Sequence, residues 1–212
     1  MTSFPDLFRK ATGHKPYPFQ CRLAQGKEWP AVLKAATGTG KTAAVALAWL
    51  WRRRFHPDLA VRSSTPRRLI YCLPMRVLVE QTRDCIVNYL QGLDLLSTGP
   101  EESNDGIGVY ALMGGDLDED WHLYPERESI IIGTQDMLLS RTLNRGYVLS
   151  RFRWPVAFGL LNNDALWVLD EVQLMGAGLP TTAQLDAFRK RFGTVGPSKT
   201  TWMSATLDSN WL

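Results

Sequence analysis

Short runs of apolar residues recur along this chain of 212 residues, and within each run polar and apolar residues do not alternate. A strand of this kind is buried on both faces, as in a parallel sheet that lies between two layers of helices. Longer amphipathic stretches separate the runs, which is typical of the crossover helices of such a sheet. We therefore predict a three-layer α/β domain with a mainly parallel central sheet.

The expected elements alternate along the whole chain. Strands are expected at 31–37, 67–74, 107–115, 129–134, 165–171 and 200–206, and helices at 41–54, 76–93, 135–144 and 180–193. The segment 97–106 is rich in Gly, Pro, Ser and Asn and is expected to be a loop. Because ligands of open α/β sheets bind beyond the carboxyl ends of the strands, the polar residues that follow the strands are expected to form one site.

The amino-acid composition excludes few classes of function. The chain is 45% hydrophobic and 21% charged, with a net charge of +3, so charge alone does not indicate a nucleic-acid binder. Three scattered cysteines without a CxxC pair argue against a disulfide framework. The N-terminus lacks the apolar core of a signal peptide, and no apolar run approaches the roughly 20 residues that span a bilayer. We expect a soluble cytoplasmic protein that does not bind membranes.

The segment AATGTGKT, residues 35–42, lies between an expected strand and an expected helix, as a phosphate-binding loop does. Its glycines allow backbone amides to turn towards phosphate oxygens, and the helix directs its positive end to the same place. A lysine in this position binds the β- and γ-phosphates, and the hydroxyl that follows it suits Mg²⁺. Ala35 replaces the usual first glycine. We predict ATP and Mg²⁺ as cofactors, with a nucleotide-binding set of Thr37, Gly38, Thr39, Gly40, Lys41 and Thr42.

Two carboxylates follow the expected strand in ALWVLDEVQ. We predict that Asp170 holds Mg²⁺ and that Glu171 orients and deprotonates the attacking water, which makes both of them catalytic together with the loop lysine. Solvated acids at a strand end are the alternative interpretation. The segment SAT ends the last expected strand, and the hydroxyls of Ser204 and Thr206 are expected to bond the acidic segment up to Gln173 and couple hydrolysis to movement.

The order and spacing of AATGTGKT, DEVQ and SAT resemble the first RecA-like domain of superfamily 2 helicases. The resemblance covers essentially the whole chain, and it implies one domain at 1–212 with an adenine-reading extension at 1–30. In this superfamily an upstream glutamine reads adenine, a role that falls on Gln20 in PYPFQ. The segments LPMRVLVEQT, MGG and GTQD fall where the family contacts the nucleic-acid backbone, which implies contacts from Arg76, Gly114 and Thr134.

Longer segments, among them FRKATGHKPYPFQ and FRWPVAFGLLNNDALWVLDEVQLMG, look most like the CRISPR-associated helicase–nuclease of type I systems. That resemblance implies ATP-driven movement on single-stranded DNA in the 3′-to-5′ direction, with Cascade as a candidate partner. It also implies a second RecA-like domain and a nuclease domain in the parent chain. These 212 residues contain neither the second domain nor a His-Asp dipeptide. We therefore expect the chain alone to hydrolyse ATP poorly and not to cleave DNA.

Other interpretations remain open at this stage. DEVQ departs from acidic boxes that end in Asp or His, which disfavours a DEAD-box-like RNA helicase. A P-loop ATPase that acts on proteins or small molecules and a non-catalytic docking module are further alternatives. The tryptophans are expected to lie in the core, above all Trp167 and Trp202, and not to stack on bases. Phe4, Phe8 and Tyr17 are equal candidates for stacking on adenine.

Overall fold

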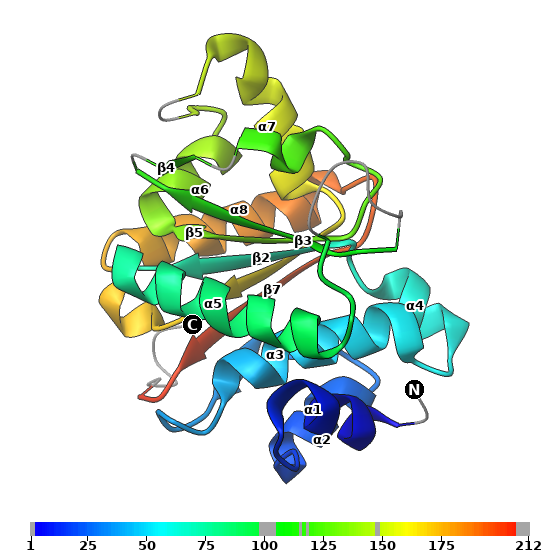
Figure 1. Ribbon diagram of the computed structural model, residues 1–212. Coiled ribbons are helices and arrows are strands. Elements are labelled where there is room, and N and C mark those ends of the chain that lie inside the picture. Colours follow the sequence, from blue (N-terminus) through cyan, green and yellow to red (C-terminus); the bar gives the residue numbers. More distant parts are fainter. Residues whose placement is uncertain (1–2, 98–104, 115, 118, 147–148, 207–212) are drawn as a thin grey trace.

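In the part of the chain that the structure describes, one sheet of seven strands forms the centre of the molecule (Figure 1). The computed structural model describes residues 3–97, 105–114, 116–117, 119–146 and 149–206. The strand order is β1-β7-β6-β2-β5-β3-β4; among the described strands the β3–β4 pair is antiparallel and the other pairs are parallel. The strands are β1 (Val32–Lys34), β2 (Arg68–Leu73), β3 (Gly108–Met113), β4 (Asp116–Leu117), β5 (Ser129–Thr134), β6 (Ala165–Leu169) and β7 (Ser198–Ser204).

Helices cover both faces of the sheet, so the predicted three-layer α/β domain with a mainly parallel sheet is confirmed. One apolar core joins the sheet to α1, α2, α3 and α5, and the other joins it to α6, α7 and α8. The helices are α1 (Phe4–Thr12), α2 (Pro18–Gln25), α3 (Lys41–Leu50), α4 (Leu59–Ser64), α5 (Arg76–Gly92), α6 (Gln135–Thr142), α7 (Trp154–Asn162) and α8 (Gly178–Phe192), with shorter turns at η1 (Trp51–Phe55), η2 (Glu119–His122), η3 (Arg151–Arg153) and η4 (Val172–Leu174).

The side chains of β2 illustrate how the two cores form. Leu69 and Tyr71 point to the face covered by α3 and α5, while Ile70 and Cys72 point to the face covered by α6 and α7. All six residues of β2 are buried, as are those of β5 and β6. This is the pattern that a strand apolar on both faces produces, because successive side chains point to opposite sides of the sheet.

The structure corrects several boundaries. The strand expected at 31–37 has only three residues, and it is not buried: Val32 and Lys34 are exposed because β1 lies at the edge of the sheet. The helix expected at 41–54 is α-helical only to Leu50 and continues as one π-helical turn. The helices α1, α2, α4 and α7 and the short strand β4 are not among the elements expected from the sequence.

Both strand tryptophans lie in the core, as predicted. Trp167 and Trp202 are almost fully buried, and each indole N–H has a partner within the protein. Trp167 Nε1 donates to the Leu161 carbonyl at 2.8 Å, and Trp202 Nε1 donates to Thr182 Oγ1 at 2.9 Å. Each indole ring therefore contributes apolar packing without leaving a buried donor unpaired.

The N-terminal segment packs on the first layer of helices. α1 buries Phe4 and Leu7 in the core shared with α3 and α5, and α2 lies directly against α3. Gly13 ends α1 in the left-handed conformation at φ +76°, so the chain can turn back into α2. This arrangement places α2 beside the start of α3. Within the described residues, none of the helices has the length and apolar character needed to cross a membrane.

Candidate active site

The loop between β1 and α3 has the geometry of a phosphate cradle. Gly38 and Gly40 adopt φ angles of +79° and +74°, which L side chains rarely adopt, and Lys41 is the first residue of α3. Thr39 Oγ1 donates to the Ala36 carbonyl at 2.7 Å, a contact that closes the turn. Backbone amides at a helix N-terminus, together with such a glycine turn, form a site for an anion.

Lys41 and the two carboxylates that follow β6 meet at one point, although 128 residues of chain separate Lys41 from Asp170. Lys41 Nζ lies 3.0 Å from Glu171 Oε1 and 3.8 Å from Asp170 Oδ1. Both Lys41 and Asp170 are buried. The parallel topology explains the meeting, because β1 and β6 both present their carboxyl ends, with β7 between them, at the same edge of the sheet.

Asp170 is held by donors on both of its oxygens. The Tyr71 hydroxyl donates to Oδ2 at 2.9 Å, and the Glu171 amide donates to Oδ1 at 2.9 Å. Burial raises the pKa of Asp170, and the hydrogen bond from Tyr71 and the charge of Lys41 partly oppose the rise. Burial and the neighbouring carboxylate also raise the pKa of Tyr71 well above its ordinary value, so its hydroxyl is a neutral donor.

Glu171 has a different environment from its neighbour. Burial tends to raise its pKa, but hydrogen bonds from Gln173 and Lys41 outweigh this effect and the pKa is lowered. Its backbone is left-handed, with φ +52° and ψ +45°, a conformation that costs a non-glycine residue about 1–2 kcal/mol. Backbone strain of this kind is concentrated at functional sites, where the surrounding structure imposes it. The turn directs the Glu171 carboxylate towards Lys41, and the contacts with Lys41 and Gln173 keep the carboxylate ionised.

A chain of hydrogen bonds leads from Glu171 to the end of β7. Gln173 Nε2 donates to Glu171 Oε2, and Ser204 Oγ donates to Gln173 Oε1 at 2.6 Å. The Thr206 amide in turn donates to Ser204 Oγ at 3.0 Å. The bond expected between the SAT segment and the acidic segment is therefore present through Ser204, while Thr206 takes part through its backbone and not through its hydroxyl.

Gln20 lies beside the phosphate loop but uses its amide within the protein. Its Nε2 donates to the carbonyls of Thr39 and Gly40, both at 3.2 Å, and its Oε1 accepts from the Tyr17 amide at 2.8 Å. A pocket of about 510 Å³ opens next to these contacts and is lined by residues from α1, α2 and the segment between them, from the phosphate loop, and from α3 and α5. Phe4 is fully buried away from this pocket, whereas Phe8 and Tyr17 line it, and Tyr17 is 59% exposed.

The residues predicted to contact nucleic acid follow three neighbouring strands. Arg76 comes after β2 and is exposed, Thr134 ends β5 and is buried, and Gly114 follows β3. Since β6, β2, β5 and β3 are adjacent, these positions extend the edge that carries Asp170 over about three strand spacings, or ~14 Å. Gly115, which the sequence places in the same turn as Gly114, lies outside the described residues.

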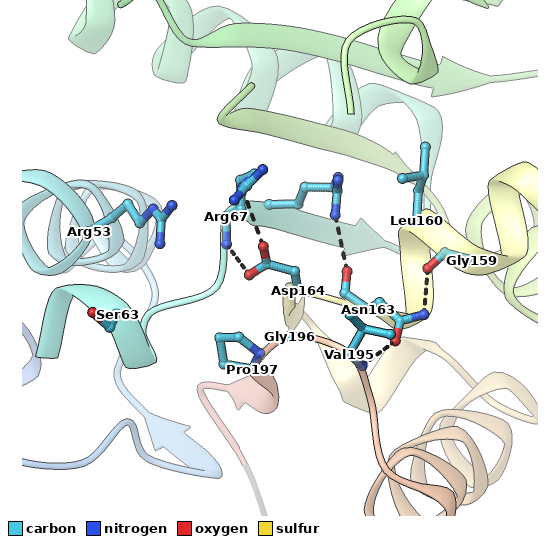
Figure 2. A pocket seen from close by; sticks show the side chains of 11 residues that line it. Arg53, Ser63, Arg67, Gly159, Leu160, Asn163, Asp164, Val195, Gly196 and Pro197 are labelled. Carbon is cyan, nitrogen blue, oxygen red and sulfur yellow. Dashed lines mark hydrogen bonds and ion pairs between the residues drawn. The ribbon is translucent and has the colours of Figure 1, made fainter. Parts of the chain in front are cut away.

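A second pocket, of about 490 Å³, lies at the opposite end of the sheet, where β2, β6 and β7 begin (Figure 2). Its arginines are already paired within the protein: Arg67 Nε lies 3.3 Å from Asp164 Oδ2, and Arg53 Nε lies 2.7 Å from Glu128 Oε1. Arg68 donates to the Asn163 carbonyl at 3.1 Å. These contacts tie the starts of the strands together, and we assign no ligand to this pocket.

The model of the DEAD/DEAH box helicase family matches residues 21–212. This chain belongs to that family. The match covers the phosphate loop, the acidic pair and the SAT segment, so the chain carries an ATP-dependent helicase domain of superfamily 2. A search of curated proteins found no match.

Solved structures similar to this helicase domain include proteins that bind DNA and a splicing factor. The DUF1998 helicase MrfA bound to DNA and AMPPNP superposes with a TM-score of 0.65 at 16% identity, over 96% of this chain and 26% of MrfA. The yeast DEAD-box splicing factor Prp28 superposes with a TM-score of 0.62 at 21% identity, over 97% of this chain and 44% of Prp28. Helicase Lhr of Mycobacterium smegmatis, bound to ssDNA and AMP-PNP, superposes with a TM-score of 0.59 at 19% identity, over 96% of this chain and 24% of Lhr. The chain thus spans a quarter to less than half of these three proteins.

Tyr71 is a further residue of this site, and it is not among the site residues expected from the sequence. Tyr71 is fully buried, and its hydroxyl lies 2.9 Å from Asp170 Oδ2 and 3.5 Å from Thr42 Oγ1. The signal was available in the strand RLIYCL, because a buried tyrosine hydroxyl among apolar residues requires a partner. Only the pairing of β2 with β6 identifies that partner.

Proposed function

We propose that this chain is the ATP-binding and ATP-hydrolysing half of a helicase that moves along single-stranded DNA, and that it serves type I CRISPR interference. One observation carries the catalytic part: Lys41 lies within 4 Å of both Asp170 and Glu171 at the carboxyl edge of the sheet. A phosphate-binding lysine and two acids at one point are what phosphoryl transfer to water requires.

The loop residues 37–42 bind the phosphates of ATP in this proposal. Lys41 exchanges its contact with Glu171 for the β- and γ-phosphates, and the loop amides bind the phosphate oxygens. The Thr42 hydroxyl and the Asp170 carboxylate fit Mg²⁺, which prefers oxygen ligands and is usually held by one or two protein groups together with substrate phosphates. When bound there, Mg²⁺ would neutralise charge on the phosphates.

Glu171 is the general base of the proposed reaction. It stays ionised because of its contacts with Gln173 and Lys41, and the departure of Lys41 to the phosphates leaves one carboxylate oxygen free to accept a proton from water. Gln173 and Ser204 connect this carboxylate to the end of β7, so a change at Glu171 reaches the last strand through two hydrogen bonds. We assign the coupling role to these residues and to Thr206.

Adenine is assigned to the pocket beside Gln20. Of the aromatic residues that line it, Tyr17 is exposed, Tyr89 is half-buried and Phe8 is buried, so Tyr17 is our choice for stacking on the base. Gln20 Oε1 accepts one bond, from the Tyr17 amide, and can accept a second from the adenine amino group, whereas donation from Nε2 to the base requires that a bond to the phosphate loop is exchanged. Base recognition would then be coupled directly to the shape of the loop.

Single-stranded DNA is assigned to the edge formed by Arg76, Gly114 and Thr134. Contacts to phosphates through the exposed Arg76 and the turn amide at Gly114 give a grip that does not depend on sequence, whereas a contact through the hydroxyl of the buried Thr134 requires that the end of β5 opens. The complexes of MrfA with DNA and of Lhr with ssDNA support DNA as the strand. An RNA helicase is the second candidate, and it is supported by the similarity to Prp28 and to Dbp5 bound to RNA.

The assignment to CRISPR interference rests on the segments that resemble the helicase–nuclease of type I systems. It includes a second RecA-like domain, a nuclease domain and recruitment by Cascade, all in the parent protein. The test is degradation of a Cascade-bound plasmid by the full-length protein, with ATP, and with Glu171→Gln as the hydrolysis-deficient variant. No ATP-dependent degradation by the wild type would overturn this assignment.

A second experiment separates the motor from its rivals. The ATPase rate of the full-length protein is measured with ssDNA, with ssRNA of the same sequence and without nucleic acid. Stimulation by ssDNA supports the proposal, and stimulation by ssRNA alone favours the RNA helicase. A rate that responds to neither indicates an ATPase with another substrate, and absence of ATP binding indicates a docking module. The isolated 212 residues are expected to hydrolyse ATP more slowly than the full-length protein.

A further inference from the structure

One buried hydroxyl lies between the two groups that the proposed function gives to Mg²⁺. Tyr71 Oη is 2.9 Å from Asp170 Oδ2 and 3.5 Å from Thr42 Oγ1. Asp170 follows β6 and Thr42 belongs to the first turn of α3, so Tyr71 of β2 connects two separate elements. Its side chain has no exposed surface.

The register of the sheet explains this position. Tyr71 pairs with Val168 on β6, and both side chains point to the face covered by α3. Asp170 comes two residues after Val168, and its amide donates to the Cys72 carbonyl at 3.0 Å, so β6 stays alongside β2 up to the acid. A tyrosine ring is long enough to reach from one strand position to the next position on the same face of the neighbouring strand.

The hydrogen bonds leave Asp170 little freedom to rotate. Its Oδ1 accepts from the Glu171 amide, and its Oδ2 accepts from Tyr71. Tyr71 has no exposed surface and Asp170 is only 6% exposed, so the Tyr71 hydroxyl is the donor that the fold supplies to Oδ2. Without this hydroxyl, the carboxylate would keep one fixed oxygen, and the other would lack a donor in a buried environment.

We propose that Tyr71 is a positioning residue for Mg²⁺-nucleotide: it fixes the Asp170 carboxylate, and it sets the distance between that carboxylate and the Thr42 hydroxyl. This inference rests on the proposed function. The geometry is that of an outer partner of a metal ligand, which orients the ligand without touching the ion. Loss of such a partner typically costs 10- to 100-fold in metal affinity or activity.

The test uses Tyr71→Phe in the full-length protein, because phenylalanine keeps the ring and removes only the hydroxyl. Binding of a fluorescent ADP analogue is titrated with Mg²⁺ and with EDTA. We expect the Mg²⁺-dependent gain in affinity to fall about 10-fold, while the affinity in EDTA changes less than twofold. In steady-state hydrolysis the Mg²⁺ concentration for half-maximal rate is expected to rise by a similar factor.

Thr142→Val is the matched control, because it removes another fully buried hydroxyl, one that bonds the Leu138 and Leu139 carbonyls on the far side of the sheet. It is expected to leave the Mg²⁺ dependence unchanged. Tyr71→Met serves as a second variant without the hydroxyl. An unchanged Mg²⁺ dependence in a folded Tyr71 variant overturns the inference, and so does failure of both variants to fold, because the hydroxyl would then serve the fold alone.

Asp170→Asn distinguishes failure of this inference from failure of the proposed function. If Asp170→Asn weakens the Mg²⁺-dependent gain in nucleotide affinity and Tyr71→Phe does not, only the positioning role of Tyr71 is wrong. If neither variant changes the gain, the assignment of Asp170 to Mg²⁺ is wrong, and the role of Tyr71 falls with it. In the Asp170→Asn background, adding Tyr71→Phe is expected to change the gain less than twofold, since the two residues act through one contact.

Discussion

The replacement Glu171→Gln tests the competition between a carboxylate and a nucleotide for the same lysine. At 3.0 Å and an effective dielectric constant of about 20, the attraction between Lys41 and Glu171 is ~5.5 kcal/mol before desolvation is counted. A hydrogen bond to a charged group has a net value of ~1.5–3 kcal/mol. The low end applies here, since Glu171 is 22% exposed and Lys41 keeps Asp170 at 3.8 Å.

Two opposite effects are expected from this change. Nucleotide no longer has to displace Lys41 from a carboxylate, so ~1.5 kcal/mol is recovered and ATP binds about tenfold more tightly. Turnover falls by about 10²- to 10⁴-fold because the general base is lost. The amide can still accept the hydrogen bond from Gln173, and glutamine is no more strained than glutamate at φ +52°. The fold is therefore expected to persist.

The assay combines a fluorescence titration of a nucleotide analogue with the steady-state ATPase rate in the presence of ssDNA. Glu128→Gln is the matched control, because Glu128 has similar exposure and is paired with Arg53 and Arg54 at the far end of the sheet. Its nucleotide affinity and turnover are expected to match the wild type. Weaker nucleotide binding by Glu171→Gln, or turnover within threefold of the wild type, would refute the reasoning.

Three further changes test other parts of the site. Arg76→Ala is expected to weaken ssDNA binding and to reduce the slope of log affinity against log salt by about 1, whereas Arg83→Ala, on the same helix, leaves the slope unchanged in a salt titration. Tyr17→Ala should weaken the binding of ATP more than the binding of inorganic triphosphate in competition titrations, because only ATP carries the base. Burial raises the pKa of Asp170, so its ionised form is disfavoured in the folded protein. Asp170→Asn should therefore raise the melting temperature of the metal-free protein at pH 7. This increase in melting temperature should shrink as the pH falls through the pKa of Asp170 in the folded protein, because the aspartate is then neutral as well.

The meeting of Lys41 with Glu171 could be predicted from the sequence because each residue has a local signature. A glycine turn before a helix identifies the lysine, and an apolar strand that ends in acids identifies the glutamate. Parallel topology then brings both to one edge. The strand order, in which β7 lies between β1 and β6, has no such local signal and came from the structure.

Burial at the sheet edge and the partners of polar groups could not be predicted in the same way. The apolar residues of β1 resemble those of a central strand, yet Val32 is exposed because β1 lies at the edge of the sheet and, among the described residues, pairs with β7 alone. The sequence predicts that the Gln20 amide reads adenine, but it gives no signal for the three bonds that this amide makes within the protein, one to the start of its own helix and two to the phosphate loop. Such contacts depend on distances between segments that the sequence does not specify.

The charges of the site imply that nucleotide and divalent cation bind together. One lysine and two ionised carboxylates give the cluster of Lys41, Asp170 and Glu171 a net charge of −1, and the N-terminus of α3 adds only about +0.5. A nucleotide without a cation would bring its phosphates against the Asp170 carboxylate in a buried environment, where repulsion is weakly screened. A cation between phosphate and carboxylate turns this repulsion into attraction, but only if the carboxylate points at it. The orientation of Asp170 therefore decides how much of the affinity depends on Mg²⁺, and the orientation depends on its two donors, the Glu171 amide and the Tyr71 hydroxyl.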